Sequence, residues 1–184
     1  MTAEALVGLL AQALITGMFF ARFARPTAAV TFARQAVVAP FNNGQALMIR
    51  MVNRRKNELI EAAALLTYSC LEQVGSQSVR RYRPLALERA KVTFFPLAWT
   101  IVHPITPESP VWGLSAEQLA EREAEFLLLL SGVDETFATT VHARTSYKAD
   151  EVVWGAKYTN LFEPPDEQGI LRVDISRLNE ITKV

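Results

Sequence analysis

The sequence predicts an antiparallel β-sandwich that follows one apolar helical segment. Short stretches alternate apolar and polar residues with the period of two that is typical of strands, and turn residues separate them. Nine prolines and eight glycines punctuate the chain without making any segment low in complexity. An apolar run of helical length precedes the first alternating stretch. Together these features predict a mainly β domain with a helical appendage.

Bulk composition limits the classes of partner. A length of 184 residues suits one domain, or one domain with an appendage. Nineteen basic and nineteen acidic side chains cancel, so no global field attracts nucleic acid, and none is expected as a partner. Cys70 is the single cysteine, which excludes an intrachain disulfide and a cysteine-based zinc cluster, and it fits a reducing compartment.

Residues 5–24 are nearly all apolar or small. About 20 such residues are the minimum for an α-helix that crosses a bilayer. Glu4 precedes the run, whereas Arg22 and Arg25 follow it, and a secretory signal would carry its positive charges first. The segment is therefore predicted to be a membrane helix whose C-terminal end faces the cytoplasm; the alternative is an amphipathic or buried helix of a soluble protein.

The strands are predicted in order along the chain. Alternation over residues 30–38 and 47–51, around an Asn-Asn-Gly turn, indicates a first hairpin. Residues 58–74 are rich in alanine and leucine, which favour a helix by propensity. Residues 97–102 read as a buried strand, and residues 115–118 have the pattern of a capping box that opens a short helix.

The basic run Arg80–Arg83 encloses one aromatic residue, Tyr82. Aromatic stacking beside basic residues can bind single-stranded nucleic acid, but a lone tyrosine provides no second platform. We therefore expect a solvated edge strand.

A second hairpin is predicted around residues 131–147. An apolar run, 126–130, leads into a polar turn, and the residues after Phe137 again alternate in polarity. If the two segments fold back on each other, Glu135 and Arg144 come close enough to form an ion pair. The alternative is an ordinary hairpin with a solvated acidic turn.

The last part of the chain gives weaker signals. A short strand is expected around residues 157–162, and the sequence Glu-Pro-Pro at 163–165 then breaks it. Residues 170–175 could add a final strand, and residues 176–180 a helical turn.

Motifs spread along the chain resemble those of inward-rectifier potassium channels, the bacterial branch in particular. The motifs, which match in the same order, are Thr16-Gly17-Met18-Phe19-Phe20-Ala21-Arg22-Phe23-Ala24-Arg25-Pro26, Arg50-x-x-Asn53-x-Arg55, Glu58-Leu59-Ile60-Glu61-Ala62, His103-x-Ile105-x-x-x-Ser109-Pro110, Gly132-x-Asp134-Glu135-Thr136, Ala143-Arg144-x-Ser146-Tyr147 and Trp154-Gly155. Together they extend from about Thr16 to Phe162.

The resemblance implies an immunoglobulin-like β-sandwich preceded by part of a transmembrane helix. It assigns residues 1–25 to the end of the inner, pore-lining helix and residues 26–184 to a cytoplasmic domain. It also implies a long strand, rather than a helix, over residues 58–74.

The resemblance also implies a gate. Four copies would surround the pore axis as a homotetramer, with Phe20 at the helix-bundle constriction and the second hairpin tip as a loop gate. The gate residues would be Gly132, Val133, Ala138 and Thr139, and Glu135 with Arg144 would brace the loop.

Lipid contact and charge in the pore follow from the same resemblance. Arg22, Arg25, Arg55 and Lys56 match positions that bind anionic lipids. Glu61 matches a position that lines the cytoplasmic pore with negative charge. Further acidic positions of the relatives are occupied here by Leu87, Lys91 and Ser131, so strong rectification is not expected.

The predicted function is therefore the cytoplasmic gating and regulatory domain of a prokaryotic inward-rectifier channel in the inner membrane. Potassium would be the permeating ion, and no cofactor is expected. No T-V-G-Y-G type of filter occurs, so the chain is expected to be a fragment or truncated product of a channel.

An enzyme is not expected. His103 and His142 have no evident catalytic or metal-binding partners, and the sequence contains no phosphate loop, no G-x-S-x-G and no H-E-x-x-H. The alternative to a channel is a membrane-anchored or soluble β-sandwich binding module without a pore.

Overall fold

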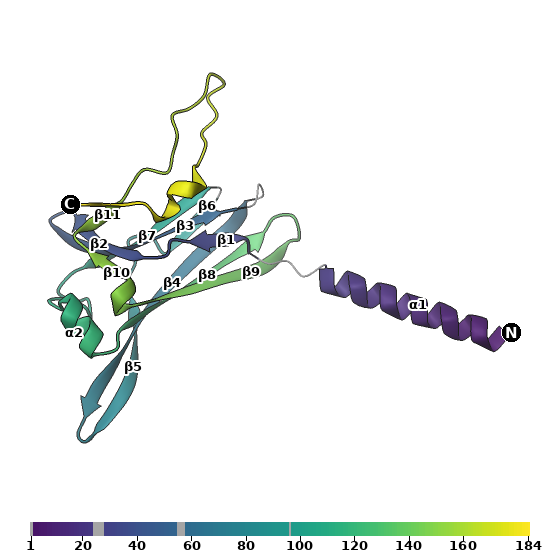
Figure 1. Ribbon diagram of the computed structural model, residues 1–184, viewed down its shortest axis with the longest axis horizontal. Helices are drawn as coiled ribbons and strands as arrows, with labels where there is room; N and C mark the ends of the chain where they lie inside the picture. The colour runs from purple at the N-terminus through teal and green to yellow at the C-terminus, as the bar shows by residue number, and fades with distance from the viewer. Residues whose placement is uncertain (1, 24–27, 55–57, 96) are drawn as a thin grey trace.

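The computed structural model describes residues 2–23, 28–54, 58–95 and 97–184. It consists of helix α1, Thr2–Phe23, followed by two β-sheets that pack face to face (Figure 1). This confirms the predicted fold class, a mainly β sandwich of the immunoglobulin-like kind preceded by one apolar helix.

The first sheet is organised around β3. Its strands are β1 (Val30–Phe32), β2 (Ala36–Phe41), β3 (Gly44–Asn53), β7 (Ala98–Ile105) and β10 (Val152–Trp154). β3 pairs antiparallel with β7 along most of its length, with β2 over its first half and with β1 at its end, and β10 adds to β2 in parallel. The predicted β2–β3 hairpin is confirmed, and Asn42 turns it with a φ of 51°.

The second sheet is organised around β4. Its strands are β4 (Leu59–Val74), β5 (Gln77–Leu85), β6 (Lys91–Phe95), β8 (Glu125–Asp134) and β9 (Thr139–Lys148). Strand β4 pairs with β8 on one side, and with β6 and then β5 on the other. The basic run lies on β5, an edge strand as predicted, and the far end of the β4–β5 hairpin projects beyond the sandwich (Figure 1).

Short elements complete the chain. They are α2 (Ala116–Glu121), the 3-10 turns η1 (Ala149–Glu151) and η2 (Ile175–Asn179), and the paired strands β11 (Ala156–Tyr158) and β12 (Ile181–Lys183). The predicted capping box is confirmed, because Ser115 and Gln118 each bond the other's backbone amide. The strand predicted over residues 170–175 is wrong: Val173 forms only one bridge, to Phe162, since no sheet edge lies alongside the segment.

The core lies between the two sheets. Inward-facing residues of β3 meet those of β4 and β8, and Tyr68 packs against Phe126 with ring centroids 5.6 Å apart. The alanine- and leucine-rich β4 is a strand because its alternate residues, such as Leu66 and Tyr68, fill this space. Cys70 is buried in the same core.

The C-terminal segment covers the other face of the first sheet. Leu161 and Leu178 pack on Ala33 and Val52 in a second apolar cluster. Beside it, the guanidinium of Arg50 lies 4.4 Å from the ring centre of Tyr158, and burial lowers the pKa of Arg50. These contacts hold the C-terminal segment against the first sheet.

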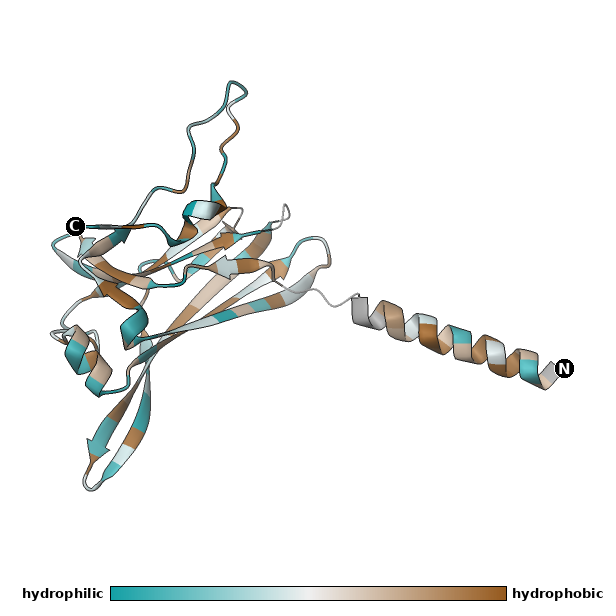
Figure 2. Ribbon diagram, in the orientation of Figure 1, coloured by the Kyte–Doolittle hydropathy of each residue, from teal (hydrophilic) through white to brown (hydrophobic). Residues whose placement is uncertain are grey.

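Helix α1 has the length and hydropathy of a membrane span. An 18-residue window, Ala3–Phe20, has a mean hydropathy of 1.7, and none of it is buried. Figure 2 shows hydrophobic residues along most of the helix, which extends away from the sandwich. An exposed helix of this composition is suited to lipid rather than to water.

We expect Tyr147→Phe to destabilise the sandwich. The buried Tyr147 hydroxyl donates to the carbonyl of Ala33 at 2.6 Å, and burial raises the pKa of Tyr147 to about 12, so the donor proton is retained. Losing this bond leaves a buried carbonyl unpaired, at a cost of about 1–2 kcal/mol. Urea denaturation measures the change, and Tyr82→Phe, at an exposed tyrosine, should leave stability unaltered.

Candidate functional site

The candidate site is the tip of the β8–β9 hairpin. The last paired residues are Asp134 and Thr139, and the loop between them is exposed to solvent. In Figure 1 this tip lies at the end of the sandwich that faces α1. The strand–loop–strand predicted from the sequence is therefore confirmed, and its tip is open to contact with other molecules.

A buried carboxylate shapes the tip. Asp134 is 1 % exposed, and its Oδ1 accepts hydrogen bonds from the backbone amides of Thr136 at 2.9 Å and Phe137 at 3.3 Å. The Thr139 hydroxyl donates to the carbonyl of Phe137 at 2.9 Å. The sequence analysis left a solvated acidic turn as an alternative and did not identify this role of Asp134, although aspartate is a typical residue for bonding its own backbone two residues on.

The predicted gate residues lie in two groups. Ala138 and Thr139 are exposed at the tip, and Ala138 has a φ of 49°, in the left-handed region. Gly132 and Val133 lie before the tip on β8, where Val133 pairs with Ile60 of β4. These four residues belong to one continuous stretch of the hairpin.

Glu61 adjoins the second group through a β-bulge. The register of β4 against β8 shifts between Ile60 and Ala63, and Glu61 is exposed with a φ of 49°. A Cβ at Gly132 would lie 3.5 Å from Ala62 Cα and from the carbonyl oxygen of Ile60. The bulge thus brings β4 into van der Waals reach of the glycine and places Glu61 beside the hairpin.

Glu135 and Arg144 do not meet within one chain, which corrects the expected ion pair of the folded-back hairpin. Glu135 lies in the turn before Thr139. Arg144 lies five positions after Thr139 on β9, where it pairs across the sheet with Leu129. At the rise of a strand, Thr139 and Arg144 are about 16 Å apart along β9. The expected ion pair does not form because β8 and β9 pair in register directly after the turn, which leaves Arg144 far along β9 from Glu135.

The outward face of the second sheet is partly apolar. Opposite one another stand Leu65, Leu129 and Arg144, and the two leucines are 55 % and 39 % exposed. They line a hollow of about 450 Å³ with Thr67 and Ser146. These exposed leucines form a small apolar patch in the middle of the sheet.

The remaining predicted residues belong to α1 or lie outside the described part of the structure. Phe20 is 72 % exposed on α1. Arg22 belongs to α1, but its side chain lies outside the described part of the structure, as do the whole of Arg25, Arg55 and Lys56.

The two histidines occupy different environments. His103 is buried, with its ring nitrogens 2.6 Å from the carbonyl oxygen of Ala86 and 2.8 Å from the Ser109 hydroxyl, and burial lowers its pKa. The carbonyl requires a proton on Nδ1, so neutral Nε2 accepts from Ser109. His142 is exposed on β9. Among the described residues, no group of three or more potential metal ligands comes together.

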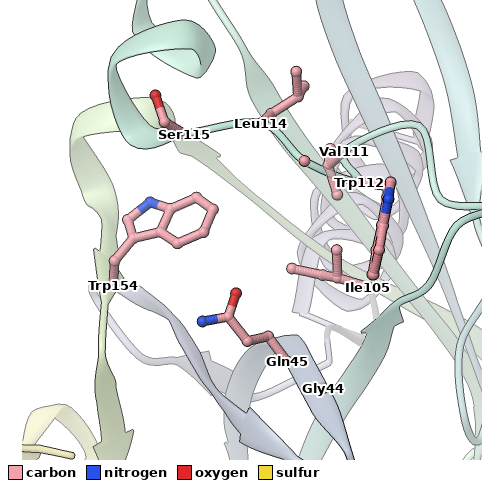
Figure 3. A pocket seen from close by; sticks show the side chains of 9 residues that line it. Gly44, Gln45, Ile105, Val111, Trp112, Leu114, Ser115 and Trp154 are labelled. Carbon is pink, nitrogen blue, oxygen red and sulfur yellow. The ribbon is translucent and has the colours of Figure 1, made fainter.

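A hollow of about 440 Å³ lies between the β2–β3 turn, the loop before α2 and β10 (Figure 3). Its lining includes Trp112, Trp154, Ile105 and Gln45 but no charged residue. It offers apolar contact and no acid, base or metal ligand.

The fold and the site define a β-sandwich domain attached to a membrane-type helix, with an exposed hairpin tip at the end that faces the helix. Residues 30–184 match the family described as inward rectifier potassium channel C-terminal domain. The chain belongs to this family, and its sequence places it with the bacterial inward rectifiers.

Two relatives show the range of similarity. The chain is 38 % identical over 185 residues to the inward rectifier potassium channel Kirbac3.1 of Paramagnetospirillum magnetotacticum, an alignment that covers 99 % of this chain and 62 % of the relative. It is 29 % identical over 187 residues to the human ATP-sensitive inward rectifier potassium channel 8, covering 97 % and 44 %. The chain thus spans 62 % of the length of the first relative and 44 % of the length of the second.

We expect Asp134→Ala to loosen the hairpin tip without unfolding the sandwich. The amides of Thr136 and Phe137 lose their acceptor, so their hydrogen exchange should accelerate by about tenfold or more, since each such bond contributes about 1–1.5 kcal/mol. Amide exchange followed by NMR or mass spectrometry measures this. Glu135→Ala, one residue on and exposed, is the control; equal exchange in the two variants would contradict the role given to Asp134.

Proposed function

We propose that this chain is the cytoplasmic gating and regulatory domain of a prokaryotic inward-rectifier potassium channel. Four copies would surround the ion pathway under the inner membrane, with most of the chain on the cytoplasmic side. The observation that carries the proposal is the exposed β8–β9 tip at the end of the sandwich that faces α1. A tip buried inside the domain could not reach a shared axis.

The composition of this end of the hairpin supports a narrow gate. Gly132 and Val133 on β8, and Ala138 and Thr139 at the tip, are small or β-branched, and a fourfold axis multiplies the bulk of each residue by four. Phe20, exposed on α1, would form a second constriction where four helices converge. Potassium ions would pass both the loop gate and the constriction at Phe20. Selection of potassium over other ions requires a selectivity filter, which these residues do not provide.

The outward face of the second sheet would line the cytoplasmic pathway. Ala63, Ser131 and His142 stand opposite one another on this face, and Lys91 pairs with Ala63 from β6. Glu61 is exposed beside them. A pathway with one acidic ring and a neighbouring lysine attracts divalent or polyamine cations weakly, which supports weak rectification.

Basic residues near the helix would contact anionic lipid. The amide of Arg54 donates to the carbonyl of Ala29 at 2.8 Å, and Val30 pairs with Asn53. The segment that follows α1 and the end of β3 therefore meet at one corner of the domain. In the sequence, Arg22 and Arg25 precede Ala29, and Arg55 and Lys56 directly follow Arg54.

Such clusters gain about 1 kcal/mol per charge near an anionic membrane surface. Lipid contact at this corner would favour one tilt or rotation of the domain, and the movement would widen or narrow the loop gate. This is how lipid contact would be coupled to gating.

The first expected outcome concerns assembly. In mild detergent, the mass of the chain measured by light scattering should correspond to a homotetramer. A stable monomer at micromolar concentration would instead support the alternative, a membrane-anchored or soluble binding module, for which the apolar hollow beside Trp112 and Trp154 would be the docking site.

The second expected outcome concerns lipid. Neutralising Arg55 and Lys56 with glutamine should reduce binding to vesicles that contain anionic phospholipid by roughly tenfold or more, given about 1 kcal/mol per charge. Binding to purely zwitterionic vesicles should not change. The double variant Lys157→Gln with Lys183→Gln, at exposed lysines of β11 and β12, is the matched control; equal loss in this variant would show that the effect is one of net charge only.

A further inference from the structure

One segment of the domain buries none of its own side chains. Residues 162–172, here called the arm, project from the sandwich between β11 and η2 (Figure 1). Every residue of the arm is exposed except the half-buried Asp166. Its apolar residues include Phe162, Ile170 and Leu171, which are 37 %, 49 % and 45 % exposed.

The arm nevertheless has a defined shape. Asp166 Oδ1 accepts from the amides of Gln168 and Ile170, both at 2.9 Å, and Asp166 Oδ2 pairs with Arg172 at 3.1 Å. At its base, the amide of Glu163 donates to the carbonyl of Arg172 at 3.0 Å. Phe162 and Val173 form an isolated bridge at its base, and no strand continues into the arm among the described residues. So short a pairing is marginally stable alone in water, and the exposed leucine and isoleucine of the arm are suited to a partner surface.

The matching surface lies on the opposite side of the same domain. The β4–β5 hairpin projects from the sandwich away from the arm (Figure 1), and β5 leaves one edge unpaired among the described strands. Exposed apolar residues stand here too, Val74 at 50 % and Tyr82 at 62 %. An unpaired edge of this length invites another chain segment.

The charges of the two surfaces are complementary. Glu163 and Glu167 are exposed on the arm, and Arg81 is exposed on β5; none of the three forms an ion pair among the described residues. The neighbouring arginines are already engaged, Arg80 with Glu123 at 3.0 Å and Arg83 with Glu72 at 2.6 Å. Arg81 is thus the guanidinium on this edge that is available to an acidic partner.

We propose that the arm of one copy docks along the β5 edge of the next copy and reaches both faces of this strand, with Leu171 against Tyr82 on one face and Glu167 near Arg81 on the other. The proposal rests on the tetramer of the proposed function and identifies a head-to-tail contact within it. Two different surfaces on opposite sides of one chain generate a closed ring when the rotation between copies is right, whereas a twofold contact uses the same surface twice.

Disulfide trapping tests this contact on the full chain. The native Cys70 is buried, so it does not interfere. The double variant Leu171→Cys with Tyr82→Cys, oxidised in detergent, should give a ladder of covalent dimer, trimer and tetramer on denaturing gels. Each single variant should stay monomeric on the gel, because the arm of one copy contacts the β5 edge of the next copy. Two arms, or two β5 edges, do not come together in this arrangement.

A matched pair controls for random collision. Lys157→Cys with Tyr82→Cys places one thiol on β11, which is exposed but outside the arm, and should give no ladder. Charge exchange gives a second measure. Arg81→Glu should lower the yield of the ladder several-fold in the double-cysteine background, and adding Glu167→Arg should restore it.

The outcomes separate this contact from the proposed function. A tetrameric mass without a ladder overturns arm docking and leaves the channel domain standing. A monomeric mass without a ladder overturns the tetramer and the docking with it. Covalent dimers from a single-cysteine variant would show a twofold contact and overturn the head-to-tail arrangement.

Discussion

The pairing of β4 with β8 determines the rest of this domain. Strand β4 is sixteen residues long. It pairs with β8 along one edge and with β6 and β5 along the other, so both of its edges have neighbours in the second sheet. Its inward residues fill the core, its bulge places Glu61 beside Gly132, and its far end forms the projecting hairpin with β5. A slip of one residue in this register would turn the buried face of β4 to solvent and displace the β8–β9 tip.

The sequence predicted those features whose signal is local. The Asn-Asn-Gly turn of the first hairpin and the Ser115–Gln118 capping box depend on residues within a few positions, and both are confirmed. Amino-acid composition predicted the wrong element where packing determines the structure. The alanines and leucines of β4 favour a helix in isolation, and only burial of alternate residues against β8 and the first sheet makes them a strand. Family resemblance supplied that information, since it carries tertiary context that local propensity does not.

The errors in predicting the site concern contacts that depend on strand register and on burial. The Glu135–Arg144 pair assumed a hairpin in which the turn meets the middle of the returning strand, but the observed register separates the two side chains. The role of Asp134 was not predicted, because burial of its carboxylate under the turn depends on the packing of the hairpin. The strand expected over residues 170–175 had a suitable composition but no neighbouring edge. None of these outcomes follows from spacing alone.

The backbone of Ala138 has a consequence for the motion of the tip. An alanine in the left-handed region lies roughly 1–2 kcal/mol above its preferred conformations, because its Cβ approaches the following carbonyl. The Asp134 carboxylate holds the turn in this shape against that preference. The hydrogen bonds of Asp134 to Thr136 and Phe137 thus offset a backbone cost at Ala138, so loss of these bonds would favour a change of the Ala138 backbone toward its preferred region.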